Sequence, residues 1–262
     1  MKIGAILLDM DGVLYHGDRA LPGAVDFVRS AADIPHCFLT NNPILPPEEI
    51  AEKLQNLGFA RPDPRFIVTS AEATAQWLQQ RKPRFRYFAV GAGGLHRALA
   101  RYGVEDRRHA DFVVVGEGPG LDYESLTQGI NLILQRGAGL IATNPDCSVD
   151  AVHHGRHRVL PGGGALVAAF SVAAHVAPQV IGKPHPLLYQ MAMERLGVGP
   201  QNCLMIGDRP DTDVLGAVRL GISSALVRTG RFMPGAAWPV ELPLPDYDTA
   251  DLAELSQCLG FA

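Results

Sequence analysis

The stretch Ile3–Gly12, IGAILLDMDG, decides the fold of this chain. Its apolar run Ile3–Leu8 has the length and composition of a strand that is buried on both faces. Asp9 and Asp11 follow at once, and carboxylates two residues apart in extended chain project to the same side. Because like charges this close disfavour joint ionisation, the pair needs a cation between the carboxylates or a proton on one of them. An ordinary turn that caps the next segment is the alternative for this tetrapeptide alone.

Apolar runs alternate with amphipathic stretches along the rest of the chain. Further strands are expected at His36–Leu39, Tyr87–Val90, Phe112–Val115, Leu140–Ala142, Gln179–Ile181, Cys203–Ile206 and Ser224–Val227. Helices are expected at Pro47–Leu57, Ala71–Gln80, Leu95–Tyr102, Tyr123–Gln135, Leu187–Leu196, Asp213–Leu220 and Asp251–Leu259. Strands that alternate with helices indicate βαβ units and a mainly parallel sheet, so the expected fold class is α/β.

Three more strand ends carry polar side chains of use to a phosphate or metal site. The sequence Thr40-Asn41-Asn42 follows one strand and offers a hydroxyl and turn amides to anionic oxygens, or else caps the following helix. Lys183 stands between Gly and Pro after another strand, as a fixed positive charge or as a solvated lysine. Asp208 and Asp213 follow a further strand and suggest oxygen ligands for a metal; for the neighbouring Asp211, helix capping is a good account.

Length, composition and charge narrow the class of protein. The 262 residues carry a formal net charge of −4 with an isoelectric point of about 6.1, which argues against nucleic acid as the main partner. The N-terminus lacks the pattern of a secretory signal, and the longest mostly apolar stretch, Gly164–Ala177, is too short for a membrane helix. The four cysteines have no paired spacing, which favours reduced, buried thiols. We therefore expect a cytoplasmic enzyme that binds neither nucleic acid nor membranes.

Taken together, LLDMDG, FLTNN, IGKPHP and MIGDRPDTD resemble the four motifs of the haloacid dehalogenase-like hydrolases. The resemblance covers nearly the whole chain, and the phrases DMDGVLYHG, TNPD and GKP are similar to the NagD-like phosphatase branch. It implies a Rossmann-like parallel-sheet core and a phosphatase that acts on small phosphorylated metabolites: sugar phosphates, nucleotides or pyridoxal phosphate. Nothing in the sequence separates these substrates.

The resemblance also implies a role for each matching residue. Asp9 would be the nucleophile that forms an aspartyl-phosphate, and Asp11 the general acid and base. Mg²⁺ would be held by Asp9, Asp208 and the backbone carbonyl of Asp11. The phosphate-binding and supporting groups would be Thr40, Asn41, Asn42, Lys183 and, in support of the lysine or the metal, Asp213.

The spacing of the motifs leaves room for an inserted domain. Thr40 and Lys183 are separated by more than a hundred residues with their own strand–helix alternation, which is enough for a whole α/β domain. We expect a catalytic core of residues 1–71 and 179–262, and a cap of residues 72–178. In the resembling family the loop that holds Asn144 and Asp146 faces the active site, so these two side chains either recognise the leaving group or form a structural turn.

Two glycine-rich loops and a histidine cluster receive the plainer interpretation. Gly91–Gly94 is an incomplete dinucleotide fingerprint, and Pro161–Gly164 lacks the ending of a phosphate loop, so both are expected to be tight turns before helices. His153, His154 and His157 are expected to be solvated residues of a hairpin, not metal ligands.

Other functions on the same fold remain open at this point. A phosphotransferase or mutase is disfavoured, because mutases of the superfamily carry their cap between the first two motifs. A dehalogenase would not need Asp11. A non-catalytic binding protein would be expected to have lost Asp9, Asp11, Lys183 or Asp208, and all four are present. A homodimer that forms through the cap is also expected.

Overall fold

The computed structural model describes residues 3–153 and 156–261, which form two compact units. The first unit comprises Met1–Thr40, Pro47–Val68 and Lys183–Ala262, and the second comprises Asn41–Pro46 and Thr69–Gly182. The expected cap, 72–178, lies inside the second unit, which also contains residues 41–46, 69–71 and 179–182, which were expected in the core. That the second unit serves as a cap stays a prediction.

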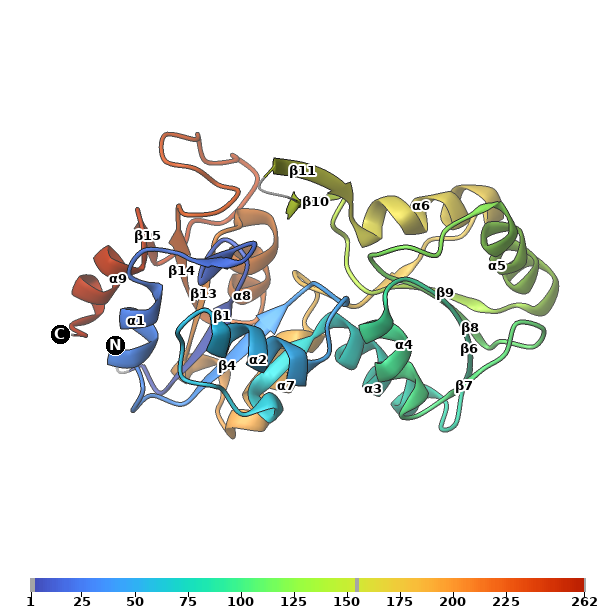
Figure 1. The fold of residues 1–262 in the computed structure, drawn as a ribbon, viewed down its shortest axis with the longest axis horizontal. Helices are drawn as coiled ribbons and strands as arrows, with labels where there is room; N and C mark the ends of the chain where they lie inside the picture. The colour runs from blue at the N-terminus through green and yellow to red at the C-terminus, as the bar shows by residue number, and fades with distance from the viewer. Residues whose placement is uncertain (1–2, 154–155, 262) are drawn as a thin grey trace. The chain divides into compact units, whose positions relative to one another are not determined.

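The first unit is built on a six-stranded sheet with the order β15-β14-β13-β1-β4-β5 (Figure 1). The strands are β1 (Ala5–Asp9), β4 (His36–Thr40), β5 (Ile67–Thr69), β13 (Cys203–Gly207), β14 (Ser223–Val227) and β15 (Tyr247–Thr249). The pairings of β1 with β13 and β4, of β13 with β14 and of β14 with β15 are all parallel. Every residue of β1 and β13 is buried, as expected for central strands with both faces covered.

Helices connect these strands. They are α1 (Ala24–Ser30), α2 (Pro47–Asn56), α7 (Leu187–Leu196), α8 (Leu215–Arg219) and α9 (Leu252–Leu259), with 3₁₀ turns at Pro64–Phe66 and Pro200–Asn202. A small antiparallel hairpin, β2 (Tyr15–His16) and β3 (Arg19–Ala20), follows β1. The helix expected from Asp213 begins instead as a π-helical turn, Pro210–Val214, before α8. The expected strand–helix order of an α/β fold is confirmed.

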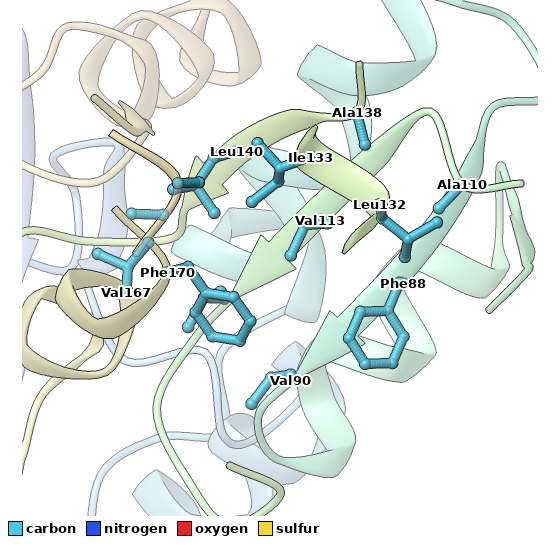
Figure 2. Packing of buried hydrophobic residues seen from close by; sticks show 13 residues of the cluster. Phe88, Val90, Ala110, Val113, Leu132, Ile133, Ala138, Leu140, Val167 and Phe170 are labelled. Carbon is cyan, nitrogen blue, oxygen red and sulfur yellow. The ribbon is translucent and has the colours of Figure 1, made fainter. Parts of the chain in front are cut away.

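The second unit has its own parallel sheet, in the order β12-β9-β8-β6-β7. Its strands are β6 (Arg86–Val90), β7 (Val104–Glu105), β8 (Phe112–Val115), β9 (Gly139–Ala142) and β12 (Gln179–Val180). Its helices are α3 (Ser70–Arg81), α4 (Gly93–Ala100), α5 (Tyr123–Arg136) and α6 (Gly163–Ala174). The core shown in Figure 2 places Phe88 and Val113 of the sheet against Leu132 of α5 and Phe170 of α6. Burial of these large apolar side chains is what holds α5 and α6 to the sheet.

Both glycine-rich loops are tight turns, as expected. A side chain at Gly94 would collide with the carbonyl oxygens of Pro43 and Ile44, and the Gly94 N–H donates to the latter at 2.9 Å. Gly162 likewise precedes α6 and packs against the backbone of Asp146. These glycines allow close approach of two backbones, and this accounts for them without a nucleotide.

The remaining expectations have mixed outcomes. The backbone of β10 (Ser148–His153) and β11 (Arg156–Pro161) forms the expected hairpin, but the histidine cluster lies outside the described residues: His154 is not described, nor are the side chains of His153 and His157. All four cysteines are free; Cys37 and Cys203 are buried, whereas Cys147 and Cys258 are exposed, so burial was wrong for half of them. Among the described residues, no helix is long and apolar enough to cross a bilayer.

Candidate active site

Three buried carboxylates meet at the carboxyl edge of the first unit's sheet. Asp9 ends β1 and Asp208 directly follows β13, and the register that pairs Leu8 with Ile206 brings the two strand ends together. Oxygens of Asp9, Asp208 and Asp213 lie within 4.8 Å of one another, with exposed fractions of 8, 3 and 1%. Oxygen ligands in this number and spacing suit a hard divalent cation.

Lys183 joins two of these carboxylates. Its Nζ lies 2.9 Å from Asp9 Oδ1 and 2.7 Å from Asp213 Oδ1, and the lysine is almost fully buried. Burial lowers the pKa of Lys183, but attraction to Asp213 and Asp9 raises it by more, so the ammonium stays charged.

The carboxylates of this cluster are short of positive charge. Burial raises the pKa of Asp208 well above its usual range, and the Asp9 and Asp213 charges raise it further. Burial also raises the pKa of Asp213 to about 6 against the opposing effect of Lys183. Both members of the Lys183–Asp213 pair thus have raised pKa values: burial raises that of Asp213, and attraction to the two carboxylates raises that of Lys183. We assign an ionised pair at neutral pH, because the 2.7 Å contact between Lys183 Nζ and Asp213 Oδ1 has the short distance of a charge-assisted hydrogen bond.

Asp208 is held by the segment that follows β14. The Arg231 N–H donates to Asp208 Oδ2 at 2.8 Å, and the Thr229 hydroxyl donates to the Gly12 carbonyl at 2.7 Å. Side chains at Gly12 or Gly230 would collide with the Asp208 carboxylate. Gly12 has a positive φ of 81°, which only glycine adopts readily. Gly12 and Gly230 therefore leave room for the Asp208 carboxylate between the turn after β1 and the segment after β14.

Asp213 is fixed by the π-helical turn in which it lies. The Arg209 N–H donates to Asp213 Oδ2 at 3.2 Å. The buried Tyr189 hydroxyl of α7 donates to the Thr212 carbonyl at 2.8 Å. Single π-helical turns are frequent at functional sites, because the extra residue re-aims a side chain. Here the turn directs Asp213 to Lys183.

Asp11 and Thr40 stand close to this cluster along the same sheet edge. The side chain of Asp11 is 54% exposed, and its Oδ1 lies 3.8 Å from His16 Nδ1. Its carboxylate is not one of the three buried carboxylates that lie together, whereas that of Asp213 is. Thr40 ends β4, the neighbour of β1, and is buried.

The other residues singled out from the sequence belong to the second unit. Asn41 Nδ2 donates to Asp146 Oδ2 at 3.1 Å, and Asn144 Nδ2 donates to the Asn41 carbonyl at 2.8 Å. Asn42 Oδ1 accepts from the Ile44 N–H at 2.8 Å. Asn144 and Asp146 are buried. Asn41, Asn144 and Asp146 thus belong to one polar network.

Two members of that network were missed in the sequence. Glu117 is buried and its Oε1 accepts from Asn144 Nδ2 at 3.0 Å, while the Ser70 hydroxyl donates to the Asn41 carbonyl at 2.5 Å. Glu117 does follow the strand Phe112–Val115, and a charge at that position was the available signal.

Comparison with known proteins agrees with these motifs. Residues 6–105 match the profile of the haloacid dehalogenase-like hydrolases, and residues 180–255 match a HAD-hydrolase-like profile. An acid sugar phosphatase of Staphylococcus aureus is 36% identical over 230 residues, which cover 86% of each chain. The chain belongs to the haloacid dehalogenase-like hydrolases, in their NagD-like phosphatase branch.

Solved structures of this family have the same fold over almost the whole chain. The 4-nitrophenylphosphatase of Thermotoga maritima superposes with a TM-score of 0.88 at 32% identity, and each chain is covered to 97%. NagD of Escherichia coli K-12 gives a TM-score of 0.83 at 28% identity, with 97% of this chain and 98% of that chain covered. The Rossmann-like fold class expected for this hydrolase is confirmed.

Proposed function

We propose that this hydrolase is a Mg²⁺-dependent phosphomonoesterase that works through an aspartyl-phosphate on Asp9. The observation that carries the proposal is the cluster of Asp9, Asp208 and Asp213 around Lys183. Three carboxyl groups stand against one ammonium among these four side chains. Such a buried group of oxygen ligands at a strand edge fits a divalent cation in its ligand chemistry.

The metal would be held by the carboxylates of Asp9 and Asp208, by Asp213 behind them and, from the family resemblance, by the carbonyl of Asp11. When bound, Mg²⁺ supplies positive charge to the carboxylates and to the phosphoryl oxygens. The small size of Mg²⁺ and its preference for carboxylate oxygens favour it over softer ions at an all-oxygen site.

In the first step a carboxylate oxygen of Asp9 attacks phosphorus, and the bond from phosphorus to the ester oxygen breaks. Asp11 gives its proton to that leaving oxygen. In the second step Asp11 takes a proton from water, which attacks the phosphorus of the aspartyl-phosphate and releases inorganic phosphate and free Asp9. The exposure of Asp11 suits a group that exchanges protons with solvent, whereas Asp9 is buried, where water competes less with attack.

Lys183, Thr40 and the backbone N–H of Asn41 are proposed to bind the phosphoryl oxygens. Lys183 keeps its charge next to Asp9 because Asp213 compensates it from the other side. Positive charge fixed in advance stabilises the transition state without reorganisation during the reaction. Asn42 belongs to the same loop and is assigned only to its support, since its side chain accepts from the Ile44 N–H.

The substrate is proposed to be a small phosphorylated metabolite. The relative named acid sugar phosphatase favours a sugar phosphate within the classes expected from the sequence, and nucleotides and pyridoxal phosphate are the alternatives to screen. The cytoplasmic location and the homodimer stay predictions; light scattering coupled to size-exclusion chromatography tests the second.

The proposal is tested with p-nitrophenyl phosphate as substrate, in Mg²⁺ and in EDTA. We expect turnover in Mg²⁺, none in EDTA, and a loss of about 10⁴-fold or more in the Asp9→Asn variant, which keeps the shape but removes the nucleophile. Turnover that survives in Asp9→Asn would refute the nucleophile. A phosphorylated Asp9 peptide, trapped by acid quench and found by mass spectrometry, would identify the intermediate.

A further inference from the structure

Asn41 lies where the chain leaves the first unit, directly after Thr40, and three hydrogen bonds hold it within the second unit. Its carbonyl accepts from Asn144 Nδ2 and from the Ser70 hydroxyl, and its side-chain amide donates to Asp146 Oδ2. A carbonyl oxygen has two lone pairs, and both are used here. The orientation of the Asn41 peptide is therefore set by side chains of the second unit.

Both amide hydrogens of Asn144 are already donated to groups of the protein. Asn144 is fully buried; one N–H goes to the Asn41 carbonyl and the other to Glu117 Oε1, while Oδ1 accepts from the Asp146 N–H at 3.1 Å. An asparagine amide has two donor hydrogens. Its orientation is fixed, because Nδ2 faces two acceptor oxygens and Oδ1 faces the Asp146 N–H.

Asp146 is committed to the same arrangement. Its Oδ2 receives the Asn41 amide and its carbonyl receives the Gly164 N–H at 2.9 Å, with 4% of the residue exposed. A buried carboxylate that accepts a side-chain amide fixes that amide more strongly than a neutral acceptor does.

From this network we propose that Asn144, Asp146 and Glu117 are positioning residues that do not contact the leaving group. They hold Asn41, and with it the proposed phosphate-binding loop Thr40-Asn41-Asn42. The inference rests on the proposed function, in which the Asn41 N–H binds a phosphoryl oxygen. It assigns to the inserted unit a part in binding the phosphoryl group common to every substrate.

The two roles of these side chains predict different patterns of loss. A positioning residue affects the binding of the phosphoryl group. Its loss therefore lowers kcat/KM by one common factor for all esters, and it lowers the affinity for inorganic phosphate to the same extent. A leaving-group contact gives losses that vary with the ester and leaves phosphate binding unchanged. We expect Asn144→Ala to lower kcat/KM about tenfold for p-nitrophenyl phosphate, phenyl phosphate and glucose 6-phosphate alike.

The experiment compares Asn144→Ala and the milder Glu117→Gln and Ser70→Ala with Asn131→Ala. Asn131 is the matched control, because its exposed amide donates to the Thr127 carbonyl within α5 of the same unit. Calorimetry of inorganic phosphate in Mg²⁺, well below the unfolding temperature, gives the second readout. It is independent of turnover, so a wild type that binds phosphate but hydrolyses no ester would count against the proposed function and not against this inference.

A third measurement uses the Asn41–Asp146 pair. Because Asp146 acts on the Asn41 side chain, Asp146→Ala should cost little in phosphate affinity once Asn41→Ala is present. Additive losses in this cycle, ester-dependent losses, or lowered unfolding temperatures with unchanged phosphate affinity would each overturn the proposal.

Discussion

Two buried polar clusters of this hydrolase differ in what holds their side chains together. In the first unit, Asp9, Asp208 and Asp213 lie close together, and the ammonium of Lys183 contacts Asp9 and Asp213. In the second unit, Asn144 uses both of its donors and its acceptor on neighbouring groups of the protein. Carboxylates crowded around one ammonium suit a cation, whereas side chains that hydrogen-bond to one another suit a structural support. Burial alone does not distinguish the two, since both clusters are buried.

The largest effect is expected where the only ammonium of the first cluster is lost. Lys183→Met leaves Asp9 and Asp213 unpaired and buried, and the free energy of unfolding should fall by about 3–5 kcal/mol in the absence of metal. Activity should vanish as well. Urea unfolding followed by circular dichroism measures the change; a loss below about 1 kcal/mol would mean that the carboxylates become protonated at little cost.

Removal of a carboxylate from the same cluster should act in the opposite direction. Asp208→Asn relieves repulsion, so the metal-free protein should gain about 1–2 kcal/mol, while its Oδ1 still accepts from the Arg231 N–H. Mg²⁺ at a hundredfold excess over its Kd should stabilise the wild type by about 2.7 kcal/mol and this variant far less. Thermal unfolding with and without Mg²⁺ measures both differences.

Asp146→Asn is the matched change in the second cluster. It makes the same replacement of a carboxylate by an amide, but where the carboxylate accepts the Asn41 amide. We expect it to destabilise the protein and to keep the stabilisation by Mg²⁺. If Asp208→Asn and Asp146→Asn had the same sign of effect, the contrast between the clusters would be wrong.

A smaller effect is expected for the hydroxyl that supports the turn of Asp213. Tyr189→Phe removes the bond to the Thr212 carbonyl and should cost about 1 kcal/mol of stability, with a modest fall in kcat. Tyr123→Phe is the control, because Tyr123 is 87% exposed. Equal kcat values for the two variants would show that the hydroxyl does not help to place Asp213.

Sequence reasoning located the first cluster well, because its members follow strands. Asp9 and Asp208 stand at or just after β1 and β13, and parallel strands of one sheet bring such positions to one edge. Lys183 also follows an apolar run, but that strand, β12, belongs to the second unit's sheet, so the same rule does not account for its position. The closeness of Asp213 to Lys183 was less accessible, since it depends on a π-helical turn that no periodicity indicates. The short helix α1 was not placed by residue range, because seven residues contain too little apolar pattern.

The second cluster was found only in part. Asn144 and Asp146 were noted for their motif, but their partners lie far away in the sequence: Asn41 about a hundred residues before, and Glu117 on another strand end. Single side-chain hydrogen bonds over such separations leave no local signal. For the same reason the assignment of residues 41–46 to the second unit needed the structure.

The membership of that short segment bears on attempts to exchange the inserted unit between relatives. A chimaera that replaced residues 69–182 alone would bring in foreign partners for Asn41 and leave the native loop in place. A graft that also carries residues 41–46 would keep donor and acceptor from one parent. The transplantable module of this enzyme therefore consists of two pieces of chain, and the smaller one begins directly after Thr40.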